Sequence, residues 1–395
     1  MNQNKIKKIS PQKNTKGYAE SLLGGWDVNC YIFKRIDTID DSLINFKFNE
    51  KDAKELLNII KRTKIIRNGG KPEEGDFLPK GFENEESKGF NDYDFLRYVL
   101  YRYRYNIYPK FHIIEDYPPC VQIEPTSICN YRCVMCYQAD KSFSNKSEGF
   151  MGYMKFDLFK KAIDELHGNV EAITLASRGE PTLHPRFDEM LRYVSNKFLG
   201  FKVNTNASLM NERLAHLLLE SNINTLVFSV DAADKNTYEQ IRVNGKFDSV
   251  LKNIETFSEI KEKYYPNNNM QTKISGVKIS DSKQSMSEMA SVWSGLVDDV
   301  AFVNYNPWES AYTNSDNSLS EPCSDLWRRT FLWWDGKINP CDYDYKSTLF
   351  RNKIPNFSDT SISEIWNSDA YDELRYKHLN SSRNSVEPCR RCVKI

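Results

Sequence analysis

The stretch CNYRCVMC, residues 129–136, decides how this chain is interpreted, because it places three cysteines in a short segment. The chain has 395 residues, of which 40% are hydrophobic and 27% charged, an ordinary composition for a globular protein of two or three domains. It contains 9 cysteines, and all but two of them fall into two groups. In a chain without secretory features, such groups favour metal ligation over disulfides.

Charge and targeting features argue against several classes of partner. The 54 Lys and Arg residues balance 54 Asp and Glu residues, so the net charge gives no support for nucleic acid or an anionic membrane as a partner. The start of the chain, MNQNKIKKISPQKNTKG, is basic, but no apolar segment follows it. No run of about 18 apolar residues occurs further on. We therefore expect a cytoplasmic protein that binds neither membranes nor nucleic acids.

Three parts of the chain differ in their hydrophobic pattern. Residues 1–115 form an N-terminal extension with no clear period, a polar Gly-rich loop over 68–91 and a final amphipathic helix, DYDFLRYVLYRYRY; the pattern assigns this extension no role. In residues 116–318, apolar runs alternate with helical segments, which predicts a parallel β/α array. Residues 319–395 lose this rhythm and hold the second cysteine group.

The β/α array consists of six predicted strands and the helices between them. Helical periodicity is clear over 156–168, 185–198, 211–221 and 247–261, and in the first of these Asp157 could cap the start and Gly168 the end. A parallel sheet follows from the repeated alternation. The predicted strands are CVQIEP (120–125), AITLAS (172–177), FKVNTN (201–206), TLVFSV (225–230), KISGVKI (273–279) and VAFVNY (300–305).

The first cysteine group comprises Cys129, Cys133 and Cys136, directly after the first predicted strand. Three thiolates can bind one cube of iron and sulfide and leave one iron without a protein ligand, which makes that iron a site for chemistry. A zinc site or a set of buried free thiols is the alternative. Zinc would need a fourth ligand, and no histidine lies between His112 and His167.

The second cysteine group comprises four residues near the end of the chain. Four thiolates can complete the coordination of one cluster, which would then carry electrons without an open iron. A structural zinc knuckle is the alternative, because zinc ribbons also combine four cysteines and a CxxC pair. The residues are Cys323, Cys341, Cys389 and Cys392.

CNYRCVMC resembles the CxxxCxxC motif of the radical SAM superfamily, in which S-adenosylmethionine (SAM) chelates the open iron of a [4Fe-4S] cluster. SRGEP (177–181), NTNA (204–207) and FSVDAADKNTYEQIR (228–242) resemble three further motifs of the superfamily in the expected order. The resemblance implies a partial (β/α)6 TIM-like barrel. It also implies SAM contacts, in part through the backbone, by Met135, Gly179, Glu180, Asn206, Ser229 and Arg242.

Residues 319–395 resemble the twitch domain, a shortened SPASM domain that carries one auxiliary [4Fe-4S] cluster. Two [4Fe-4S] clusters, one binding SAM and one auxiliary, are therefore expected. The C-terminal segments are also similar to aminocyclitol-oxidising members of the superfamily and to radical SAM/SPASM proteins of surface-polysaccharide gene clusters.

The activity that this resemblance implies is reductive cleavage of SAM to a 5'-deoxyadenosyl radical, which abstracts a substrate hydrogen. We expect an oxidoreductase or epimerase acting on a carbohydrate or cyclitol, with the auxiliary cluster as electron acceptor and a flavodoxin or ferredoxin as electron donor. Peptide modification is the alternative activity. A remote alternative is a zinc-binding interaction protein without enzymatic activity.

Overall fold

The computed structural model describes residues 6–11, 20–23 and 25–395. Residues 1–5, 12–19 and 24, which include most of the basic start of the predicted N-terminal extension, lie outside the described residues. In the part of the chain that is described, no helix is both long and apolar enough to cross a membrane.

One sheet organises the molecule, with strand order β1-β7-β6-β5-β4-β3-β2-β8-β9 among the described residues. Strands β2 to β7 pair in parallel with their neighbours, and β8 joins the outer edge of β2, also in parallel. The short strands β1 and β9 pair antiparallel at the two edges. The bounds are β1 Glu20–Ser21, β2 Cys120–Ile123, β3 Ala172–Leu175, β4 Gly200–Thr205, β5 Thr225–Ser229, β6 Gln271–Lys278, β7 Asp299–Asn304, β8 Arg329–Leu332 and β9 Ile338–Asn339.

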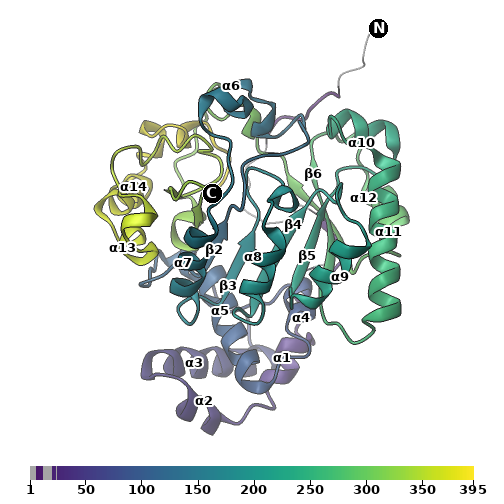
Figure 1. Cartoon of the computed structure of the whole chain (residues 1–395). Helices are drawn as coiled ribbons and strands as arrows, with labels where there is room; N and C mark the ends of the chain where they lie inside the picture. The colour runs from purple at the N-terminus through teal and green to yellow at the C-terminus, as the bar shows by residue number, and fades with distance from the viewer. Residues whose placement is uncertain (1–5, 12–19, 24) are drawn as a thin grey trace.

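Helices return the chain between the parallel strands and cover the outer face of the sheet (Figure 1). Their apolar stripes pack against the strands in the largest hydrophobic cluster of the structure. The six predicted strands and the predicted partial (β/α)6 TIM-like barrel are confirmed. The helices of this region are α6 Lys141–Ser144, α7 Phe156–Leu166, α8 Phe187–Val194, α9 Glu212–Glu220, α10 Lys235–Ile241, α11 Phe247–Tyr264 and α12 Met286–Trp293.

The start of α7 differs from the prediction, whereas its end agrees with it. Lys155 occupies the N-cap without a side-chain hydrogen bond to the helix, and Asp157 lies in the first turn, where its charge faces the positive end of the helix dipole. Gly168 follows the C-cap His167 with φ +86°, a left-handed conformation that glycine adopts without strain.

The N-terminal extension is helical, although its sequence shows no clear period. Most of its helices are too short to show a repeat, and one of them, α4, lies inside the segment that we predicted to be a loop. These helices bury their apolar residues in a separate cluster that also includes Cys120 and Ala172 at the amino ends of β2 and β3. The bounds are α1 Tyr31–Ile36, α2 Asp41–Lys47, α3 Glu50–Arg67, α4 Gly81–Glu86 and α5 Asp92–Phe111.

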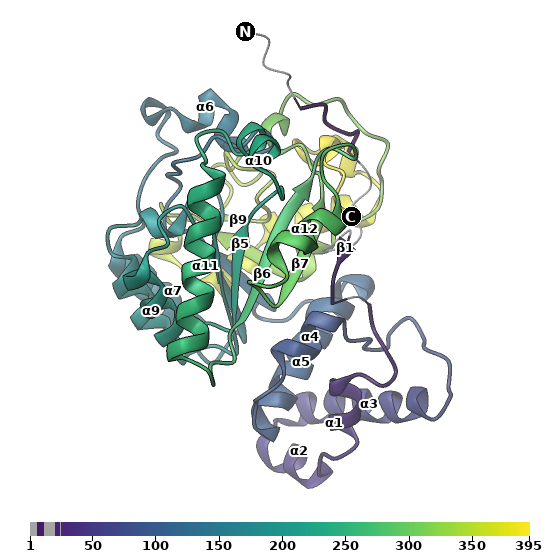
Figure 2. The same cartoon turned by 90° about the vertical axis from the view of Figure 1, so that its right-hand side faces the viewer.

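Helices α4 and α5 close the amino-terminal end of the barrel (Figure 2). On α5, the Arg97 guanidinium forms an ion pair with Glu171, directly before β3, at 2.6 Å. On α4, the Glu86 carboxylate accepts a hydrogen bond of 3.0 Å from the Thr225 hydroxyl at the start of β5. The amphipathic helix predicted from YRYRY is therefore confirmed, and it packs on the barrel.

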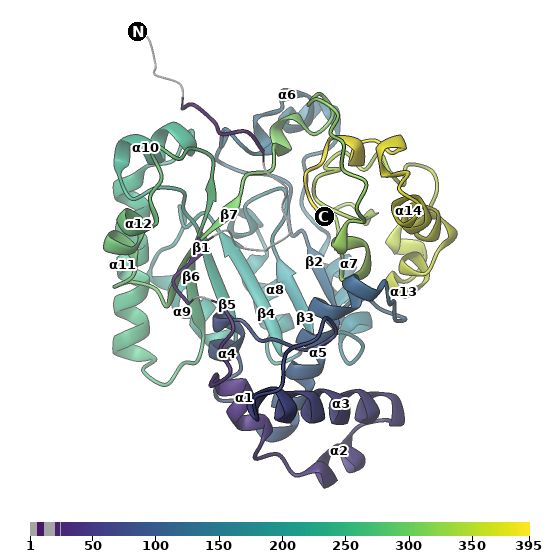
Figure 3. The ribbon, with the colours of Figure 1, turned by 180° about the vertical axis from the view of Figure 1, so that it is seen from behind.

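The C-terminal part packs beside the other edge of the barrel, as the view from behind shows (Figure 3). It contributes β8 and β9 to the common sheet and adds α13 Ile362–Trp366 and α14 Asp369–Leu379. Trp333, directly after β8, is fully buried. The sheet thus continues across the predicted domain boundary between residues 318 and 319, and the boundaries 1–115, 116–318 and 319–395 remain predictions.

Candidate active site and cluster ligands

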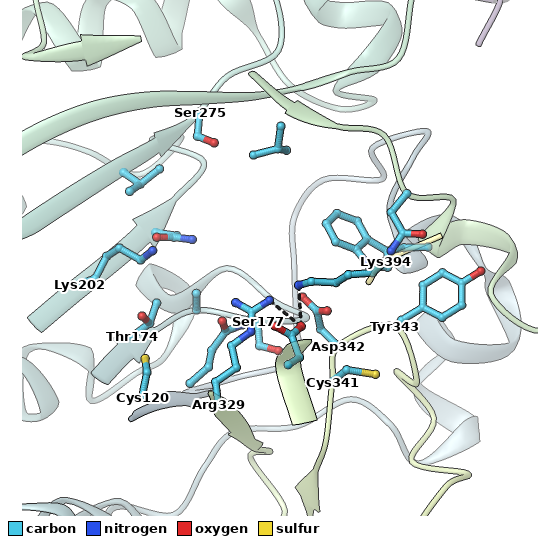
Figure 4. Close-up of a pocket in the computed structure, with 18 of the residues that line it drawn as sticks. Cys120, Thr174, Ser177, Lys202, Ser275, Arg329, Cys341, Asp342, Tyr343 and Lys394 are labelled. Carbon is cyan, nitrogen blue, oxygen red and sulfur yellow. Dashed lines mark hydrogen bonds and ion pairs between the residues drawn. The ribbon is translucent and has the colours of Figure 1, made fainter. Parts of the chain in front are cut away.

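A cavity of about 530 Å³ runs through the inside of the barrel from its floor to the C-terminal part (Figure 4). Because parallel strands bring their carboxyl ends to one edge, motifs that are far apart in sequence meet there. All thirteen predicted site residues line this cavity: Cys129, Cys133, Met135, Cys136, Gly179, Glu180, Asn206, Ser229, Arg242, Cys323, Cys341, Cys389 and Cys392.

The loop that carries the first cysteine group is held by backbone hydrogen bonds. The amide of Arg132 donates to the carbonyl of Val243 at 2.9 Å, and the amide of Val134 donates to Ile241 at 3.0 Å. Both acceptors lie at the end of α10 and just after it. A second anchor comes from β4, where the Asn206 amide group donates to Asn130 Oδ1 at 2.9 Å. The three thiols are therefore presented by a fixed loop.

The thiols of this group are free and largely withdrawn from water. Burial, together with the charges of Cys133 and Glu180, raises the pKa of Cys129 to about 12. Burial also raises the pKa of Cys133 and of Cys136. Such thiols are protonated at neutral pH without metal, and a bound cation supplies the positive charge that favours the thiolate.

Gly179 and Glu180 pack the SRGEP turn against the cysteine loop. A Cβ at Gly179 would lie 2.2 Å from the Thr126 carbonyl oxygen and 2.6 Å from that of Ile128, so only glycine fits. The Glu180 carboxylate is buried and accepts hydrogen bonds from the Thr205 hydroxyl at 2.7 Å and the Asn206 amide at 2.7 Å. Burial raises the pKa of Glu180. Its carboxylate therefore joins the ends of β3 and β4.

The remaining predicted SAM contacts are Met135, Ser229 and Arg242, which also line the cavity. Met135 is buried beside the cysteines. Ser229 ends β5 and is partly exposed to the cavity. Arg242 forms a buried ion pair with Asp231, and the charge of Arg242 opposes the rise in the pKa of Cys133.

The second cysteine group is assembled from three distant segments of the C-terminal part. Burial raises the pKa of Cys392 to about 11 and holds those of Cys341 and Cys389 well above the ordinary value, with contributions from neighbouring thiols of the set. Arg383 stabilises the end of the chain by donating to the Cys392 carbonyl at 2.6 Å. His378 accepts a hydrogen bond from the Cys323 amide at 3.1 Å.

The donor sets fit iron–sulfur clusters. No group of three or more His, Cys, Asp and Glu side chains in residues 6–11, 20–23 and 25–395 is arranged around a single metal ion. Both sets consist of free thiols, which are the ligands of iron–sulfur clusters. In a four-iron cluster each thiolate binds its own iron.

Arg178 is a connecting residue whose role the sequence pattern did not reveal. Its guanidinium is buried and forms an ion pair with Glu124, just after β2, at 2.6 Å. It also donates to the Tyr345 carbonyl at 2.7 Å and lies 4.1 Å from the centre of the Trp333 ring. Arg178 thus ties the SRGEP turn to the C-terminal part. The only sequence signal was its departure from a glycine that is usual at this place in the motif.

Family comparisons agree with the site. Residues 123–267 match the radical SAM superfamily, and residues 323–393 match SPASM, described as an iron-sulfur cluster-binding domain. The two matches together span more than half of the chain. The chain therefore belongs to the radical SAM superfamily and carries a C-terminal SPASM domain. SAM, a [4Fe-4S] cluster and an additional iron–sulfur cluster are the cofactors of this class.

Individual relatives are distant. A Pyrococcus furiosus protein, the tungsten-containing aldehyde ferredoxin oxidoreductase cofactor-modifying protein, is 24% identical over 318 residues, which cover 68% of this chain and 86% of that protein. Several other curated relatives match over only about a third of their own length.

Two solved structures are also similar to this chain. BtrN in complex with AdoMet and 2-DOIA is 15% identical with a TM-score of 0.47, and 71% of this chain and 94% of BtrN are covered. Streptococcus suis SuiB bound to the precursor peptide SuiA is 15% identical with a TM-score of 0.49, and 86% of this chain and 82% of SuiB are covered. At this level of likeness neither structure assigns a substrate to the chain.

Proposed function

We propose that this radical SAM enzyme oxidises a hydroxyl-bearing carbon of a carbohydrate or cyclitol, with an electron carrier such as a flavodoxin or ferredoxin as donor. Cys129, Cys133 and Cys136 would hold the SAM-binding cluster, and Cys323, Cys341, Cys389 and Cys392 the auxiliary cluster. Met135, Gly179, Glu180, Asn206, Ser229 and Arg242 would surround SAM. Oxidation needs an electron acceptor, whereas epimerisation, the other activity expected from the sequence, does not.

The observation that carries this proposal is that both cysteine groups line one cavity. A substrate between them would contact the SAM-binding end on one side and the auxiliary end on the other. Proximity of this kind favours oxidation, because the substrate must lose an electron after it has lost a hydrogen atom. In this proposal the second cysteine group would take part in the reaction in addition to stabilising the fold.

The walls of the cavity suit a small polar substrate. Hydrogen-bonding side chains from neighbouring strands face it, including Thr174, Lys202 and Ser275 (Figure 4). Tyr101 and Arg102 of α5 line its floor, so the helical extension forms part of the cavity. A cavity of this size that presents a few polar groups among apolar side chains is typical of small-molecule sites.

Asp342 is the side chain that we assign to proton transfer. Its carboxylate lines the cavity next to Cys341, and the charges of Arg329 and Lys394 act on it (Figure 4). When bound, the cofactors supply a 5'-deoxyadenosyl radical that abstracts the carbon-bound hydrogen, and an acceptor for the electron that remains. Asp342 would accept the hydroxyl proton, so that loss of one hydrogen atom, one proton and one electron leaves a ketone.

The test compares 5'-deoxyadenosine with oxidised product in a variant that carries Cys389→Ala and Cys392→Ala. The proposal predicts that this variant cleaves SAM but yields little ketone from a carbon-deuterated substrate, because the electron acceptor is lost. Asp342→Asn should likewise form 5'-deoxyadenosine with little ketone while keeping both clusters. A full yield of product without the auxiliary cluster would reject oxidation through that cluster.

Peptide modification is the second candidate, and it is favoured by a curated relative, the antilisterial bacteriocin subtilosin biosynthesis protein AlbA of Bacillus subtilis, which is 30% identical over 138 residues. The same assay distinguishes the two activities. Deuterium transferred to 5'-deoxyadenosine from a labelled peptide, and none from sugars or cyclitols, would replace the first proposal by the second.

A further inference from the structure

A row of polar side chains crosses the inner face of the sheet below the predicted SAM contacts. Gln122 of β2, Thr174 of β3 and Lys202 of β4 stand in register on neighbouring strands, and all three line the cavity. In closed barrels such inward positions are filled mainly by bulky branched side chains. Here an amide, a hydroxyl and an ammonium group face an open space.

Lys202 is the charged member of this row, which we name the lumen row. Neither Lys202 nor Gln122 makes a side-chain hydrogen bond or ion pair within the part of the chain that the structure describes. Figure 4 shows Lys202 directed into the cavity. A lysine inside a barrel without a counter-charge is unfavourable, and a negatively charged ligand would remove that cost.

The cysteine groups have cations of their own, so Lys202 is not required to balance a cluster. Arg132 and Arg242 act on the first group, and Arg383 and Lys394 on the second. Lys202 also lies four residues before Asn206 on β4, which at ~3.3 Å per residue places it about 13 Å below the predicted SAM contact. Its charge therefore faces the part of the cavity that remains for the substrate.

The side chains across the cavity floor from Lys202 carry an excess of positive charge, as Lys202 does. Asp325 is surrounded by Arg328 at 2.9 Å, Arg329 at 2.8 Å and Lys394 at 2.5 Å, and the charges of Arg329 and Lys394 also act on Asp342, so three cations share two carboxylates. Although burial raises the pKa of Tyr105, Arg328 and Arg329 hold it below the ordinary value. The lower cavity thus has an excess of positive charge.

We propose that the lumen row binds an anionic group of the substrate, a phosphate or a carboxylate, with Lys202 as the charged contact and Gln122 and Thr174 as hydrogen-bonding neighbours. This inference rests on the proposed function in one respect, namely that the cavity is the substrate site. The substrate of the proposed oxidation is then an acidic or phosphorylated carbohydrate or cyclitol.

The experiment is a calorimetric titration of the protein with both clusters in place, without reductant, with inorganic pyrophosphate and with malonate. Ionic strength is kept at about 0.15 M, at which exposed charges are screened within ~8 Å. We expect one saturable site in the unsubstituted protein, and a loss of affinity of about tenfold or more in Lys202→Met. Lys202→Arg should keep most of the affinity. Preference for pyrophosphate or for malonate decides between phosphate and carboxylate.

Lys252→Met on the exposed side of α11 is the matched control and should bind like the unsubstituted protein, since the Lys252 side chain is 66% exposed. If Lys202→Met does not retain both clusters, Gln122→Leu takes its place, with an expected loss of about threefold or more. The absence of a saturable anion site, or equal affinity in the Lys202 variant, would overturn the inference. Because no turnover is involved, this result is independent of whether the enzyme oxidises its substrate.

Discussion

Single residues at the mouth of the barrel serve two purposes at once. Glu180, predicted as a SAM contact, is already engaged by Thr205 and Asn206, so its carboxylate also positions the strand ends. Asn206 in turn holds Asn130 within the cysteine loop. Substitution of these residues therefore alters the loop as well as the contact with SAM, and a cleaner test of the SAM contact uses Ser229.

Gly179→Ala should lower the stability of the cysteine loop, because the added methyl group would collide with two backbone carbonyl oxygens. We expect a loss of about 1–3 kcal/mol and incomplete iron incorporation, measured by thermal unfolding and iron content. Gly295→Ala is the control, because a Cβ at Gly295 meets nothing within 4 Å. Equal iron content and melting temperature in both variants would show that the SRGEP turn can move away.

Ser229→Ala should weaken SAM binding without loss of iron. Ser229 ends β5 at the cavity and makes no hydrogen bond with another described residue that the change would break. A lost hydrogen bond to a charged group of SAM corresponds to about 1.5–3 kcal/mol, or roughly tenfold or more in the dissociation constant. The change in the dissociation constant is measured by equilibrium binding of SAM to the oxidised protein. Ser287→Ala, at an exposed position, is the control. Unchanged affinity would remove Ser229 from the SAM site.

At the scale of elements, the N-terminal helices are the least expected feature. Arg102 of α5 and Glu83 of α4 form an ion pair with both side chains almost fully buried, and a Glu83 oxygen also accepts a hydrogen bond of 2.8 Å from Asn106. This pair joins the two helices that close the barrel floor. The stability of the floor therefore depends on a buried charge that stays paired.

Glu83→Gln should destabilise the helical extension by about 3–5 kcal/mol, because Arg102 would remain buried without a counter-charge. Glu85→Gln removes the same charge from an exposed pair with Lys88 and should cost less than about 1 kcal/mol. Urea unfolding followed by circular dichroism compares the two variants. Similar midpoints would mean that the pair contributes little to the packing of α4 against α5.

Local patterns in the sequence made the barrel predictable. They did not make the pairing of segments that are far apart in sequence predictable. Each barrel strand is an apolar run before a turn, and helices such as α11 show a clear stripe of buried residues. The pairing of β8 with β2, and the ion pair of Arg178 with Glu124, join segments that are far apart in sequence. No local pattern specifies such contacts. The short helices of the extension were missed for a related reason, because their burial depends on partners rather than on period.

At the scale of the whole molecule, the fold brings two cysteine groups, a polar lumen and a helical floor around one cavity. The barrel contributes the first cysteine group, the C-terminal part contributes the second, and Arg178 connects the two. In the proposed reaction one end of the cavity would generate the 5'-deoxyadenosyl radical and the other end would accept the electron that the substrate loses.

The central claim is that the two cysteine groups hold two separate four-iron clusters and that the first of them is the site of SAM cleavage. Its most direct test is iron content together with 5'-deoxyadenosine formation after anaerobic reconstitution. The unsubstituted protein should contain about eight irons per chain. The variant with Cys129, Cys133 and Cys136 all changed to Ala should contain about four and form no 5'-deoxyadenosine. Continued SAM cleavage by that variant, or an unchanged iron content, would contradict the account.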